Sequence, residues 1–397
     1  MLWALTKRML QEPDKRLVYR FLYNFGWKGG GAMRRFEARL RHGEVFPPFL
    51  FLSLTNACNL SCRGCWVTPS RPPRELEPDT VDRVIEEGRR RGCHFYGILG
   101  GEPLLYESLF NLFERHRDCY FQLFSNGVLL TDAVARELNR LGNVTPLISI
   151  EGREEVSDER RGGRNVYARA MAALEHCRRS RLIFGVATSV CQSNIAEVAT
   201  EEFVNEMVAR GAHYIWYYIY RPVGGDPAPE LALTPEQIVA LRRFLVDVRT
   251  RAPILVVDAY WDADGRGLCP AAMGISHHVA PTGDIEPCPP IQFALDNVRS
   301  FAEGRDPFTK SAFLAGFRSL AQQTTRGCIL LENPDVLRRF LVEQGARDTS
   351  GRGTGLAELA RMSPCASHHV PGQEIPEKHW MYRWAKRNWF FGFGAYG

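Results

Sequence analysis

The sequence predicts an α/β fold, a partial (β/α)6 TIM-type barrel followed by a small Cys-rich α+β extension. Three observations predict it. Six short apolar or β-branched runs alternate with helical patterns at intervals of roughly 30–40 residues. Three cysteines, Cys58, Cys62 and Cys65, directly follow the first of these runs. Further cysteines are spaced along the region that follows the alternation.

The predicted strands are short and end near Gly, Asn or Ser. They span residues 51–55, 96–99, 120–124, 147–150, 183–189 and 214–220. Helices are predicted to begin near Asp79 and near Thr131, where Asp or Thr can cap a first turn, and to cover 168–177 and 198–209. Repeated βα units favour parallel strands with right-handed crossovers, and in such sheets functional sites form at the carboxyl ends of the strands.

Four parts are expected along the chain. They are a basic amphipathic helical segment (1–48), the barrel (49–255), the auxiliary extension (256–370) and an aromatic-basic tail (371–397). No apolar run reaches the ~18 residues of a membrane span, and the first ten residues do not fit a secretory signal. The sequence therefore predicts a cytoplasmic location, with membrane association at the inner face as a further expectation.

Basic charge is concentrated at the beginning of the chain. Residues 1–50 hold ten Lys/Arg and four Asp/Glu, a net +6, whereas the whole chain carries +5. Apolar and basic side chains alternate there at helical spacing: Leu17, Phe21, Leu22 and Phe25 with Lys15, Arg16 and Arg20. This pattern predicts an amphipathic helix that is either docked on the barrel or adsorbed to an anionic membrane surface. No nucleic-acid-binding motif accompanies the charge, so no nucleic-acid partner is expected.

The last 27 residues interleave aromatic and basic side chains. They are Trp380, Tyr382, Trp384, Trp389, Phe390, Phe391, Phe393 and Tyr396, with Lys378, Arg383, Lys386 and Arg387. Such a composition suits a membrane interface or a partner groove. It suits equally a tail packed back over a hydrophobic cleft, and both interpretations stay open.

The 11 cysteines are an odd number, which together with the lack of an export signal argues against a disulfide framework. The spacing C-x3-C-x2-C of Cys58, Cys62 and Cys65 lets three thiolates of one loop hold an iron–sulfur cube with one iron left open. A structural zinc ion needs four ligands, and the nearby sequence offers no usual fourth ligand. Four cysteines without partner spacing are interpreted as buried apolar side chains: Cys93, Cys119, Cys177 and Cys191.

The cysteine spacing after the first strand resembles the signature of the radical S-adenosylmethionine (radical SAM) superfamily. Later segments match the superfamily in the same order: Gly100, Gly101, Glu102 and Pro103 (GGEP), then Ser125 and Asn126, then Ser149 and Glu151, then Arg161. The resemblance implies that the backbone of the GGEP segment holds the methionyl amino group of SAM. It also implies that Ser149 and Glu151 contact the ribose or carboxylate and that Arg161 approaches the carboxylate.

Two positions depart from the superfamily pattern. The residue before the third cysteine is usually aromatic and lies against the adenine, whereas this chain has Gly64. Trp66, two residues further along, is then the candidate adenine contact. Glu151 stands where many relatives have Asp, so its longer side chain is expected to shift the ribose hydrogen bond. Both departures leave the three cysteine ligands in place.

A second cysteine set, C-x13-G-x4-C over Cys269, Gly283 and Cys288, resembles the opening of a SPASM or shorter twitch extension. Such extensions carry auxiliary iron–sulfur clusters. The dense cysteine run of a full SPASM domain is missing from the sequence. The resemblance therefore implies one auxiliary [4Fe-4S] cluster on four thiolates, Cys269, Cys288, Cys328 and Cys365.

The ligand set of the auxiliary cluster has alternatives. Three thiolates with an open iron are one, and a histidine ligand, His368 or His369, is another. His277 and His278 lie on the predicted hairpin, where they face either the cluster or the substrate. The ordinary interpretation of each histidine is a surface or hydrogen-bonded residue.

The resemblance implies an enzyme that takes one electron from a flavodoxin or ferredoxin and cleaves SAM to a 5′-deoxyadenosyl radical. The radical would abstract hydrogen from an unactivated C–H bond, and the sequence marks no catalytic acid or base. The basic helix, the aromatic tail and Gly64 favour a hydrophobic or amphiphilic, lipid-like substrate. The alternative is a peptide- or protein-modifying SPASM/twitch maturase. A non-catalytic iron–sulfur electron carrier is a remote third possibility, which the SAM-contact segments disfavour.

Overall fold

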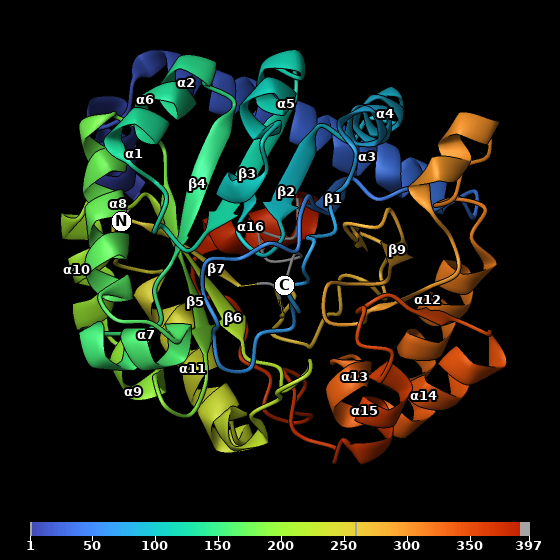
Figure 1. Cartoon of the computed structure of the whole chain (residues 1–397). Helices are drawn as coiled ribbons and strands as arrows, with labels where there is room; N and C mark the ends of the chain where they lie inside the picture. Colours follow the sequence, from blue (N-terminus) through green and yellow to red (C-terminus); the bar gives the residue numbers. More distant parts are fainter. Residues whose placement is uncertain (1, 259, 390–397) are drawn as a thin grey trace.

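The computed structural model describes residues 2–258 and 260–389 (Figure 1). Its centre is a nine-stranded sheet with the order β7-β6-β5-β4-β3-β2-β1-β8-β9. The strands are β1 (Phe49–Ser53), β2 (Phe95–Leu99), β3 (Tyr120–Ser125), β4 (Val144–Ser149), β5 (Gly185–Val190), β6 (Tyr214–Ile219), β7 (Leu255–Asp258), β8 (Ser276–Val279) and β9 (Ile285–Glu286). All neighbours from β7 to β8 are parallel, and β9 is antiparallel to β8. The predicted partial barrel is confirmed.

The six predicted strands are present with shifted ends, and the sheet is larger than predicted. β1 begins at Phe49 and β5 covers Gly185–Val190, whereas the sequence suggested 51–55 and 183–189. β7 adds a seventh strand. β8 belongs to the cysteine-rich extension yet pairs in parallel with β1, with Phe49 opposite Ser276. Such a distant partner cannot be found by local periodicity, so the extension continues the barrel sheet instead of standing apart from it.

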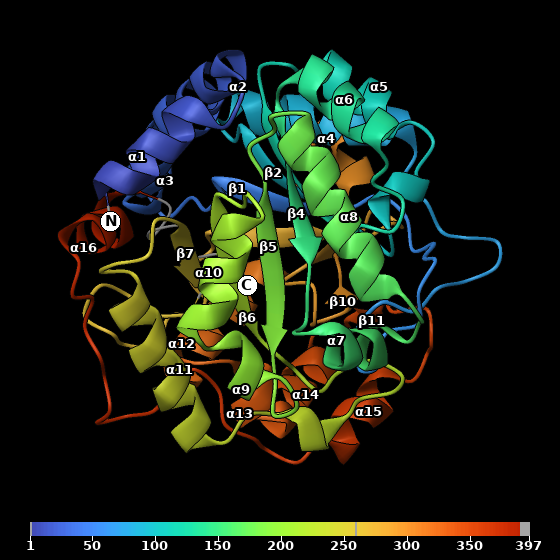
Figure 2. The same ribbon diagram turned by 90° about the vertical axis from the view of Figure 1, so that its left-hand side faces the viewer.

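Helices cover the outer face of the sheet (Figures 1 and 2). They are α4 (Pro78–Arg90), α5 (Leu109–Arg115), α6 (Asp132–Leu141), α7 (Glu154–Arg161), α8 (Val166–Arg179), α9 (Ile195–Val198), α10 (Glu201–Ala209) and α11 (Pro235–Val248), with short 3₁₀ turns η2 (Pro103–Leu105) and η3 (Pro229–Leu231). Thr131 caps α6 as predicted, since its side chain accepts from the Val134 N–H. The helix predicted over 198–209 is instead two helices, because Thr200 caps the start of α10 and interrupts the run.

The amino-terminal segment is helical and docked on the barrel. It contains α1 (Leu2–Gln11), α2 (Lys15–Arg20), the π-helix η1 (Phe21–Trp27) and α3 (Lys28–Leu40). Arg16 and Arg20 donate to backbone carbonyls at the carboxyl end of α6, where the helix dipole favours cations. The sequence placed Leu22 on the apolar face, but it is 59% exposed, because the wider π turn rotates it away from Phe25.

Aromatic and aliphatic side chains fill the amino-terminal end of the barrel. Phe25 lies with its ring centroid 4.6 Å from Phe95 and 4.9 Å from Trp389. The same inner cluster contains Met33, Phe36, Phe49, Phe51, Tyr120, Leu147, Ala187, Trp216 and Val257. The amino-terminal helices and Trp389 therefore close this mouth of the barrel, and the carboxyl ends of the strands are left for a site.

The extension packs beside the barrel (Figure 1). It contains η4 (Val298–Glu303), α12 (Ala312–Thr324), α13 (Ile329–Glu332), α14 (Pro334–Glu343), α15 (Gly355–Arg361) and a two-stranded ribbon, β10 (Phe293–Ala294) with β11 (Arg347–Asp348). The segment boundaries proposed from the sequence stay predictions. No helix among residues 2–258 and 260–389 combines the length and apolarity that crossing a membrane requires.

The aromatic-basic tail forms α16 (Trp380–Asn388), which lies near α1 and α3 in Figure 2. Its Tyr382 and Lys386 are buried, so this part of the tail is packed. The Tyr382 hydroxyl accepts a hydrogen bond from the Val256 N–H in β7 at 2.9 Å. The predicted aromatic residues Phe390, Phe391, Phe393 and Tyr396 lie outside the described residues.

Candidate functional site

The three clustered cysteines lie in the loop between β1 and α4, which we call the cysteine loop (residues 54–77). Cys58, Cys62 and Cys65 are free thiols and line one cavity of about 590 Å³. The same cavity is lined by Gly100, Gly101, Ser125, Asn126, Ser149 and Arg161. It therefore lies at the carboxyl ends of β1 to β4, as the sequence predicts, and brings most of the proposed SAM contacts together.

The GGEP glycines hold the cysteine loop. A Cβ on Gly100 would lie 2.4 Å from the Thr55 carbonyl oxygen, and one on Gly101 would lie 2.0 Å from that of Ala57. The Gly101 N–H donates to the Thr55 carbonyl at 2.8 Å. Any larger residue would push the loop away from β2, so these glycines are needed for a close approach between two backbones.

Glu102 braces the end of β3 instead of facing the cavity. Its carboxylate accepts from the Asn126 N–H at 2.8 Å, the Ser125 hydroxyl at 2.9 Å and the Leu104 N–H at 3.2 Å. The side chain is fully buried, and burial raises its pKa. Glu102 and the buried Pro103 are not among the residues that line the three large cavities. This glutamate positions the Ser125 and Asn126 segment.

Glu151 and Arg161 form a buried ion pair beside the cysteine loop. Glu151 also accepts from the Ser189 N–H at 3.0 Å. An Arg161 N–H points to the Cys62 sulfur at 4.0 Å. Burial disfavours the Arg161 charge, but Glu151 and Cys62 outweigh it and hold the pKa above its ordinary value. Arg161, which the resemblance assigns to the SAM carboxylate, thus lies between the Glu151 carboxylate and the Cys62 thiol.

Trp66 also lines the 590 Å³ cavity, but its ring packs against a histidine of the extension. The Trp66 and His278 centroids are 5.5 Å apart with the ring planes at 90°. His278 is held by the Ser53 hydroxyl at 2.7 Å and by Glu286 at 2.5 Å. His277 is bound to the Pro287 carbonyl at 3.1 Å. Both hairpin histidines are thus buried and hydrogen-bonded, as their ordinary interpretation expects.

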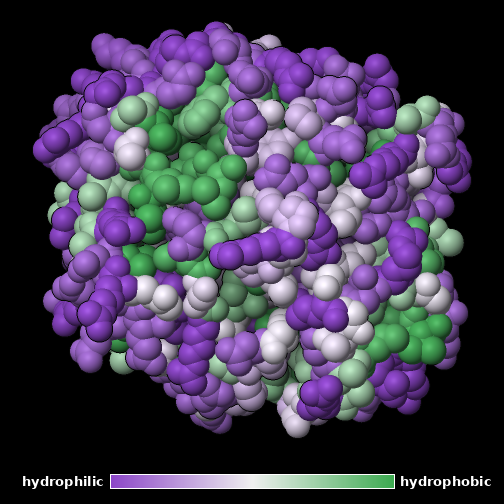
Figure 3. All heavy atoms as spheres, in the orientation of Figure 1, coloured by the Kyte–Doolittle hydropathy of each residue, from purple (hydrophilic) through white to green (hydrophobic). Residues whose placement is uncertain are grey.

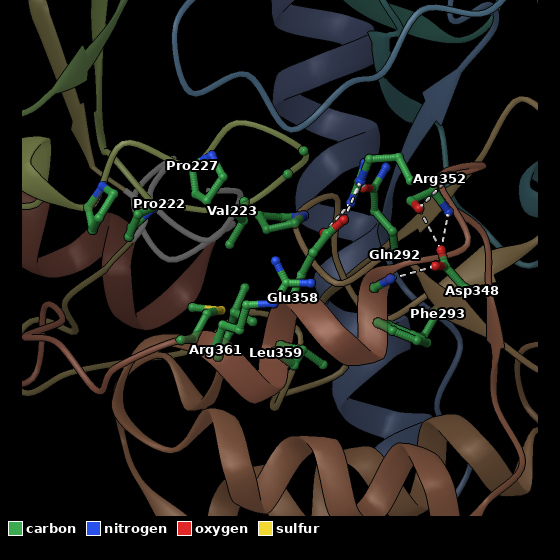
Figure 4. A pocket seen from close by; sticks show the side chains of 18 of the residues that line it. Pro222, Val223, Pro227, Gln292, Phe293, Asp348, Arg352, Glu358, Leu359 and Arg361 are labelled. Atoms are coloured by element: carbon green, nitrogen blue, oxygen red, sulfur yellow. Dashed lines mark hydrogen bonds and ion pairs between the residues drawn. The ribbon is translucent and has the colours of Figure 1, made fainter.

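Two further cavities continue from the first. One of about 270 Å³ shares Cys62, Cys65 and Trp66 with it and extends along Phe51, Phe124, Tyr218 and Tyr220. The other, of about 330 Å³, shares Val223 and Pro290 with the second. Figure 4 shows this third cavity between the loop after β6, with Pro222, Val223 and Pro227, and the extension, with Gln292, Asp348, Arg352, Glu358 and Leu359. Together they form a cleft between barrel and extension.

The second cysteine set converges from four separate segments. Cys269, Cys288 and Cys328 line one small cavity, together with Arg221 and His368. Cys365 lines the 330 Å³ cavity instead, but its thiol interacts with that of Cys328. All four thiols are free. Cys365 is held near the start of α13 because its N–H donates to the Leu331 carbonyl at 2.9 Å.

The chemistry of both thiol sets fits a metal cluster. Burial and the neighbouring Cys62 raise the pKa of Cys65 to about 11, and burial together with Cys328 raises that of Cys269 to about 11. Several crowded thiols cannot all be ionised unless positive charge is placed among them. Iron ions would supply that charge, and cysteine thiolates are the ordinary ligands of iron–sulfur clusters. The ligand assignments are proposals that rest on this fit.

Another group of ligand atoms lies at the opposite end of the barrel. His94, Asp118 and Cys119 have ligand atoms within 4.8 Å of one another. Asp118 pairs with Arg89, however, and burial followed by the charge of Lys28 lowers the pKa of His94 to about 4. Because cations already surround the group, it does not suit a metal ion. Cys93, Cys177 and Cys191 are buried, as the sequence predicts, and so is Cys119.

Sequence reasoning missed three residues of the site. Asn59 accepts from the Asn126 side chain at 2.7 Å and ties the cysteine loop to β3. Tyr220 and Arg221 follow β6 and line the 270 Å³ cavity. Tyr220 is the last residue of the strand predicted over 214–220, and Arg221 follows it directly. This position is the signal that could have indicated them, because strand ends meet at this edge of the barrel.

The fold and the site define a partial barrel with free cysteines in the loop after its first strand. The profile of the Radical SAM superfamily matches residues 52–203. The chain is 30% identical over 203 residues to the sporulation killing factor maturation protein SkfB of Bacillus subtilis, and the match covers half of each chain. It is 29% identical over 321 residues to the mycofactocin maturase MftC of Mycobacterium ulcerans, and this match covers 75% of this chain and 83% of MftC. Streptococcus suis SuiB, in a structure bound to S-adenosylmethionine, has a TM-score of 0.59 at 18% identity, covering 72% of each chain.

The segment 52–203, less than half of the chain, is thus similar to the Radical SAM superfamily. The matched segment spans about half the length of SkfB. The SuiB likeness shows that the two proteins share the fold. The cofactors of this superfamily are a [4Fe-4S] cluster and SAM, and its SPASM-type members add auxiliary clusters, in agreement with the cysteine-rich extension.

Proposed function

We propose that Cys58, Cys62 and Cys65 hold a [4Fe-4S] cluster and that the adjoining 590 Å³ cavity binds SAM. When bound, the cluster and SAM supply a 5′-deoxyadenosyl radical that abstracts a hydrogen atom from an unactivated C–H bond. The observation that carries the proposal is the convergence of three free thiols on the cavity that Asn126, Ser149 and Arg161 also line.

The chain's own residues have three tasks in this reaction. The three thiols of the cysteine loop would hold three irons of the cube and would leave the fourth iron without a protein ligand, free to bind SAM. The Glu151 and Arg161 pair keeps a fixed charge beside Cys62. The apolar walls of the 270 Å³ cavity, including Phe51, Phe124 and Tyr218, exclude water and competing hydrogen donors from the reacting carbon.

The first test is anaerobic incubation of reconstituted protein with SAM and dithionite. We expect 5′-deoxyadenosine from the wild type and none from Cys58→Ala, Cys62→Ala or Cys65→Ala. Cys177→Ala is the matched control, because Cys177 is buried away from the site. Absence of the product from the wild type under all reconstitution conditions would overturn the enzyme assignment.

We further propose that the substrate is a peptide or protein segment. The sequence alone favoured a lipid-like substrate, but the relatives favour its alternative, because SkfB and MftC are both named for maturation. An open cleft between barrel and extension, with the 330 Å³ cavity at its outer end, gives an extended chain room beside the reacting position. Paired charges along this cavity, Arg352 with Glu358, suit a polar backbone better than an acyl chain.

Deuterium transfer distinguishes the two substrate classes. Peptides encoded beside the gene and cell lipids are each fully deuterated and incubated with the reconstituted enzyme. Deuterium in 5′-deoxyadenosine from the peptides alone would support the proposal, and deuterium from the lipids alone would restore the lipid-like substrate. We infer that a flavodoxin or ferredoxin is the reductant, which replacing dithionite by each reduced protein would test.

A membrane surface remains a second candidate location. Nine of the twelve exposed large apolar side chains in the described residues come from 1–40 or α16: Trp3, Leu10, Tyr19, Leu22, Tyr23, Trp27, Leu40, Trp380 and Trp384. Figure 3 shows one face of the molecule, on which hydrophobic residues gather left of centre and at the lower right among hydrophilic ones. Because Arg16 and Arg20 are engaged with α6, adsorption would depend on the aromatic residues more than on these charges.

Liposome flotation tests this location. We propose that the wild type floats with anionic vesicles and that a Trp3→Ala/Trp27→Ala variant floats less. Val342→Ala/Leu356→Ala, which removes exposed apolar side chains elsewhere, is the matched control. Equal flotation of both variants, or no flotation of the wild type, would exclude a specific membrane face.

A further inference from the structure

The cysteine loop lacks the aromatic side chain that relatives usually carry before the third cysteine, and the structure fills that position from another strand. Gly64 has a left-handed backbone, with φ +69°. A Cβ built on it would lie 2.0 Å from the Tyr220 hydroxyl oxygen and 2.8 Å from Tyr220 Cζ. Tyr220, directly after β6, thus occupies the space into which a side chain at position 64 would project.

Tyr220 is held firmly in this position. Its side chain is 5% exposed, and its hydroxyl accepts from the Ala228 N–H at 3.2 Å. The Arg160 guanidinium lies 4.8 Å from the centre of its ring. The ring nevertheless lines the 270 Å³ cavity together with Gly64. This cavity adjoins the 590 Å³ cavity at Cys62 and Cys65, so the adenine end of a SAM molecule bound in the larger cavity could reach Tyr220 there. An aromatic ring that is fixed by its neighbours but borders a cavity is preorganised for contact with a planar ligand.

The segment after β6 fits the cysteine loop at a second point. A Cβ on Gly224 would lie 2.7 Å from the Cys65 carbonyl oxygen, so the two backbones meet closely there as well. Gly64 and Gly224 therefore lie on either side of one contact between this segment and the loop. The missing side chain at position 64 is what lets Tyr220 enter.

The other candidate for the adenine contact is Trp66. Its ring is engaged at right angles with His278, whose two nitrogens are bound to Ser53 and Glu286. Trp66 thus links the cysteine loop to the extension. Tyr220, by contrast, lies directly beside Gly64.

We propose that Tyr220 supplies the aromatic contact for the adenine of SAM, in place of the residue that Gly64 lacks. Gly64 and Tyr220 are then a compensating pair, in which the missing side chain of one makes room for the ring of the other. The proposal rests on SAM binding as stated under the proposed function. It adds the residue that recognises the adenine end of the cofactor.

Equilibrium binding of SAM to the anaerobically reconstituted protein tests the assignment without turnover. Because stacking of a base on an aromatic side chain contributes about 1–3 kcal/mol, Tyr220→Leu should weaken SAM binding by about 5- to 150-fold. Tyr220→Phe keeps the ring and should bind nearly as the wild type does. Methionine, which has no adenine, should compete equally in all three proteins.

Trp66→Leu is measured beside these variants. A larger loss in Trp66→Leu than in Tyr220→Leu would overturn the proposal and return the adenine contact to Trp66. Equal losses of SAM and methionine binding in Tyr220→Leu would also overturn it, because they indicate a general structural role. A wild type that binds no SAM would instead refute the proposed function, so the two failures are distinguishable.

A glycine comparison tests the compensating pair. Gly64→Ala should lose iron–sulfur absorbance because its methyl group meets Tyr220, whereas Gly43→Ala should not. Gly43 has a similar backbone, φ +75°, but nothing within 4 Å of an added Cβ. The double variant Gly64→Ala/Tyr220→Leu should regain absorbance. Equal behaviour of Gly64→Ala and the double variant would contradict the pairing.

Discussion

Glu102 and Asn126, which follow neighbouring strands of the barrel, are joined by a 2.8 Å hydrogen bond from the Asn126 N–H to the buried carboxylate. The same carboxylate accepts from the Ser125 hydroxyl. These two hydrogen bonds fix the position of the carboxyl end of β3 relative to Gly100 and Gly101, which follow β2. Two segments that line the 590 Å³ cavity are thereby held by a side chain that does not line it.

Removing this brace should weaken both the fold and the site. Glu102→Ala leaves the Asn126 N–H and the Ser125 hydroxyl without their acceptor, and each unsatisfied buried group costs about 1–3 kcal/mol. We expect a lower free energy of unfolding of the apoprotein and weaker SAM binding, with the iron content unchanged. Urea denaturation, equilibrium binding and iron analysis measure the three effects.

Glu107→Ala is the matched control, because Glu107 is exposed five residues further along the chain. Its unfolding free energy should stay within about 0.5 kcal/mol of the wild type. If Glu102→Ala were as stable as this control, the carboxylate would not brace β3.

The sequence indicates where these segments lie but not what each residue does. The motif with Glu102 is recognisable as a SAM-contact segment, and strand order places it at the correct edge. The role of the glutamate depends on Asn126, a partner that belongs to another strand. Likewise, Gly64 is visible as a departure from a pattern, whereas Tyr220 becomes relevant only when β6 is folded beside the cysteine loop.

The sequence predicts an aromatic and basic tail that lies on a membrane, in a partner groove or over a cleft. In the structure, one of its basic side chains forms buried ion pairs with acidic residues of the protein itself. Lys386 is fully buried and donates to Asp258 at 3.1 Å and to the Trp261 carbonyl at 2.6 Å. Glu377 lies in the same network with Arg242 and is likewise buried. Periodicity cannot distinguish a buried cation from an exposed one, because the compensating acids come from β7 and from the segment before α16.

This buried network of ion pairs should hold α16 against the barrel. Glu377 accepts from Arg242 at 2.8 Å and from Arg249 at 2.5 Å, and Lys386 lies 3.1 Å from it. Glu377→Ala leaves three buried cations with Asp258 as their remaining partner in the network. Since removal of one member of a buried ion pair costs about 3–5 kcal/mol, we expect a loss of that size in urea denaturation.

Limited proteolysis gives a local readout of the same variant, because a released α16 should be cleaved before the barrel unfolds. Glu374→Ala, an exposed neighbour, serves as the control. Unchanged proteolysis together with unchanged stability would show that the network does not hold the tail.

His213 should make stability fall in mild acid. Burial, followed by the charge of Arg8, lowers its pKa to about 3, and the Phe184 N–H donates to its Nδ1 at 3.4 Å. Glu12 lies 3.5 Å from the other nitrogen, but it is exposed and already paired with Arg8, so burial dominates. Below about pH 6.5, His213 binds a proton in the unfolded chain but not in the folded chain.

The folded state should therefore lose up to about 1.4 kcal/mol per pH unit from this residue between about pH 6.5 and about pH 3. His213→Gln keeps an acceptor for the Phe184 N–H but cannot be protonated. We expect its unfolding free energy to depend less steeply on pH than that of the wild type, whereas exposed His42→Gln should follow the wild type. Parallel curves for all three proteins would exclude His213 as a source of the slope.

Arg221 should raise the reduction potential of the auxiliary cluster. Its guanidinium hydrogen-bonds toward Cys328 and interacts with Cys288, and the residue lines both the auxiliary cavity and the 270 Å³ cavity. A nearby positive charge favours the reduced, more negative cluster. An EPR-monitored titration should give a lower midpoint potential for Arg221→Gln than for the wild type, with Arg221→Lys in between. An unchanged potential in Arg221→Gln would contradict this electrostatic role.

Cys365 and His368 are the two candidates for the fourth ligand of the proposed auxiliary cluster, and iron analysis of variants can distinguish them. The Cys365 thiol interacts with Cys328, which favours the four-thiolate set predicted from the sequence. His368 is buried and lines the cavity of the other three cysteines, and its Nε2 has no hydrogen-bond partner among the described residues. We expect Cys365→Ser to lower the iron content from about eight per chain toward about four, and His368→Gln to keep it.

Cys191→Ser is the matched control, because Cys191 is buried outside both cysteine sets and should leave the iron content unchanged. Pulsed EPR of the reduced auxiliary cluster adds a direct readout, since a histidine ligand would show strong nitrogen coupling that thiolates lack. The expected spectrum of the wild type has no such coupling. Strong nitrogen coupling that disappears in His368→Gln, with iron retained in Cys365→Ser, would make His368 the ligand and would leave the Cys365 thiol free beside the 330 Å³ cavity.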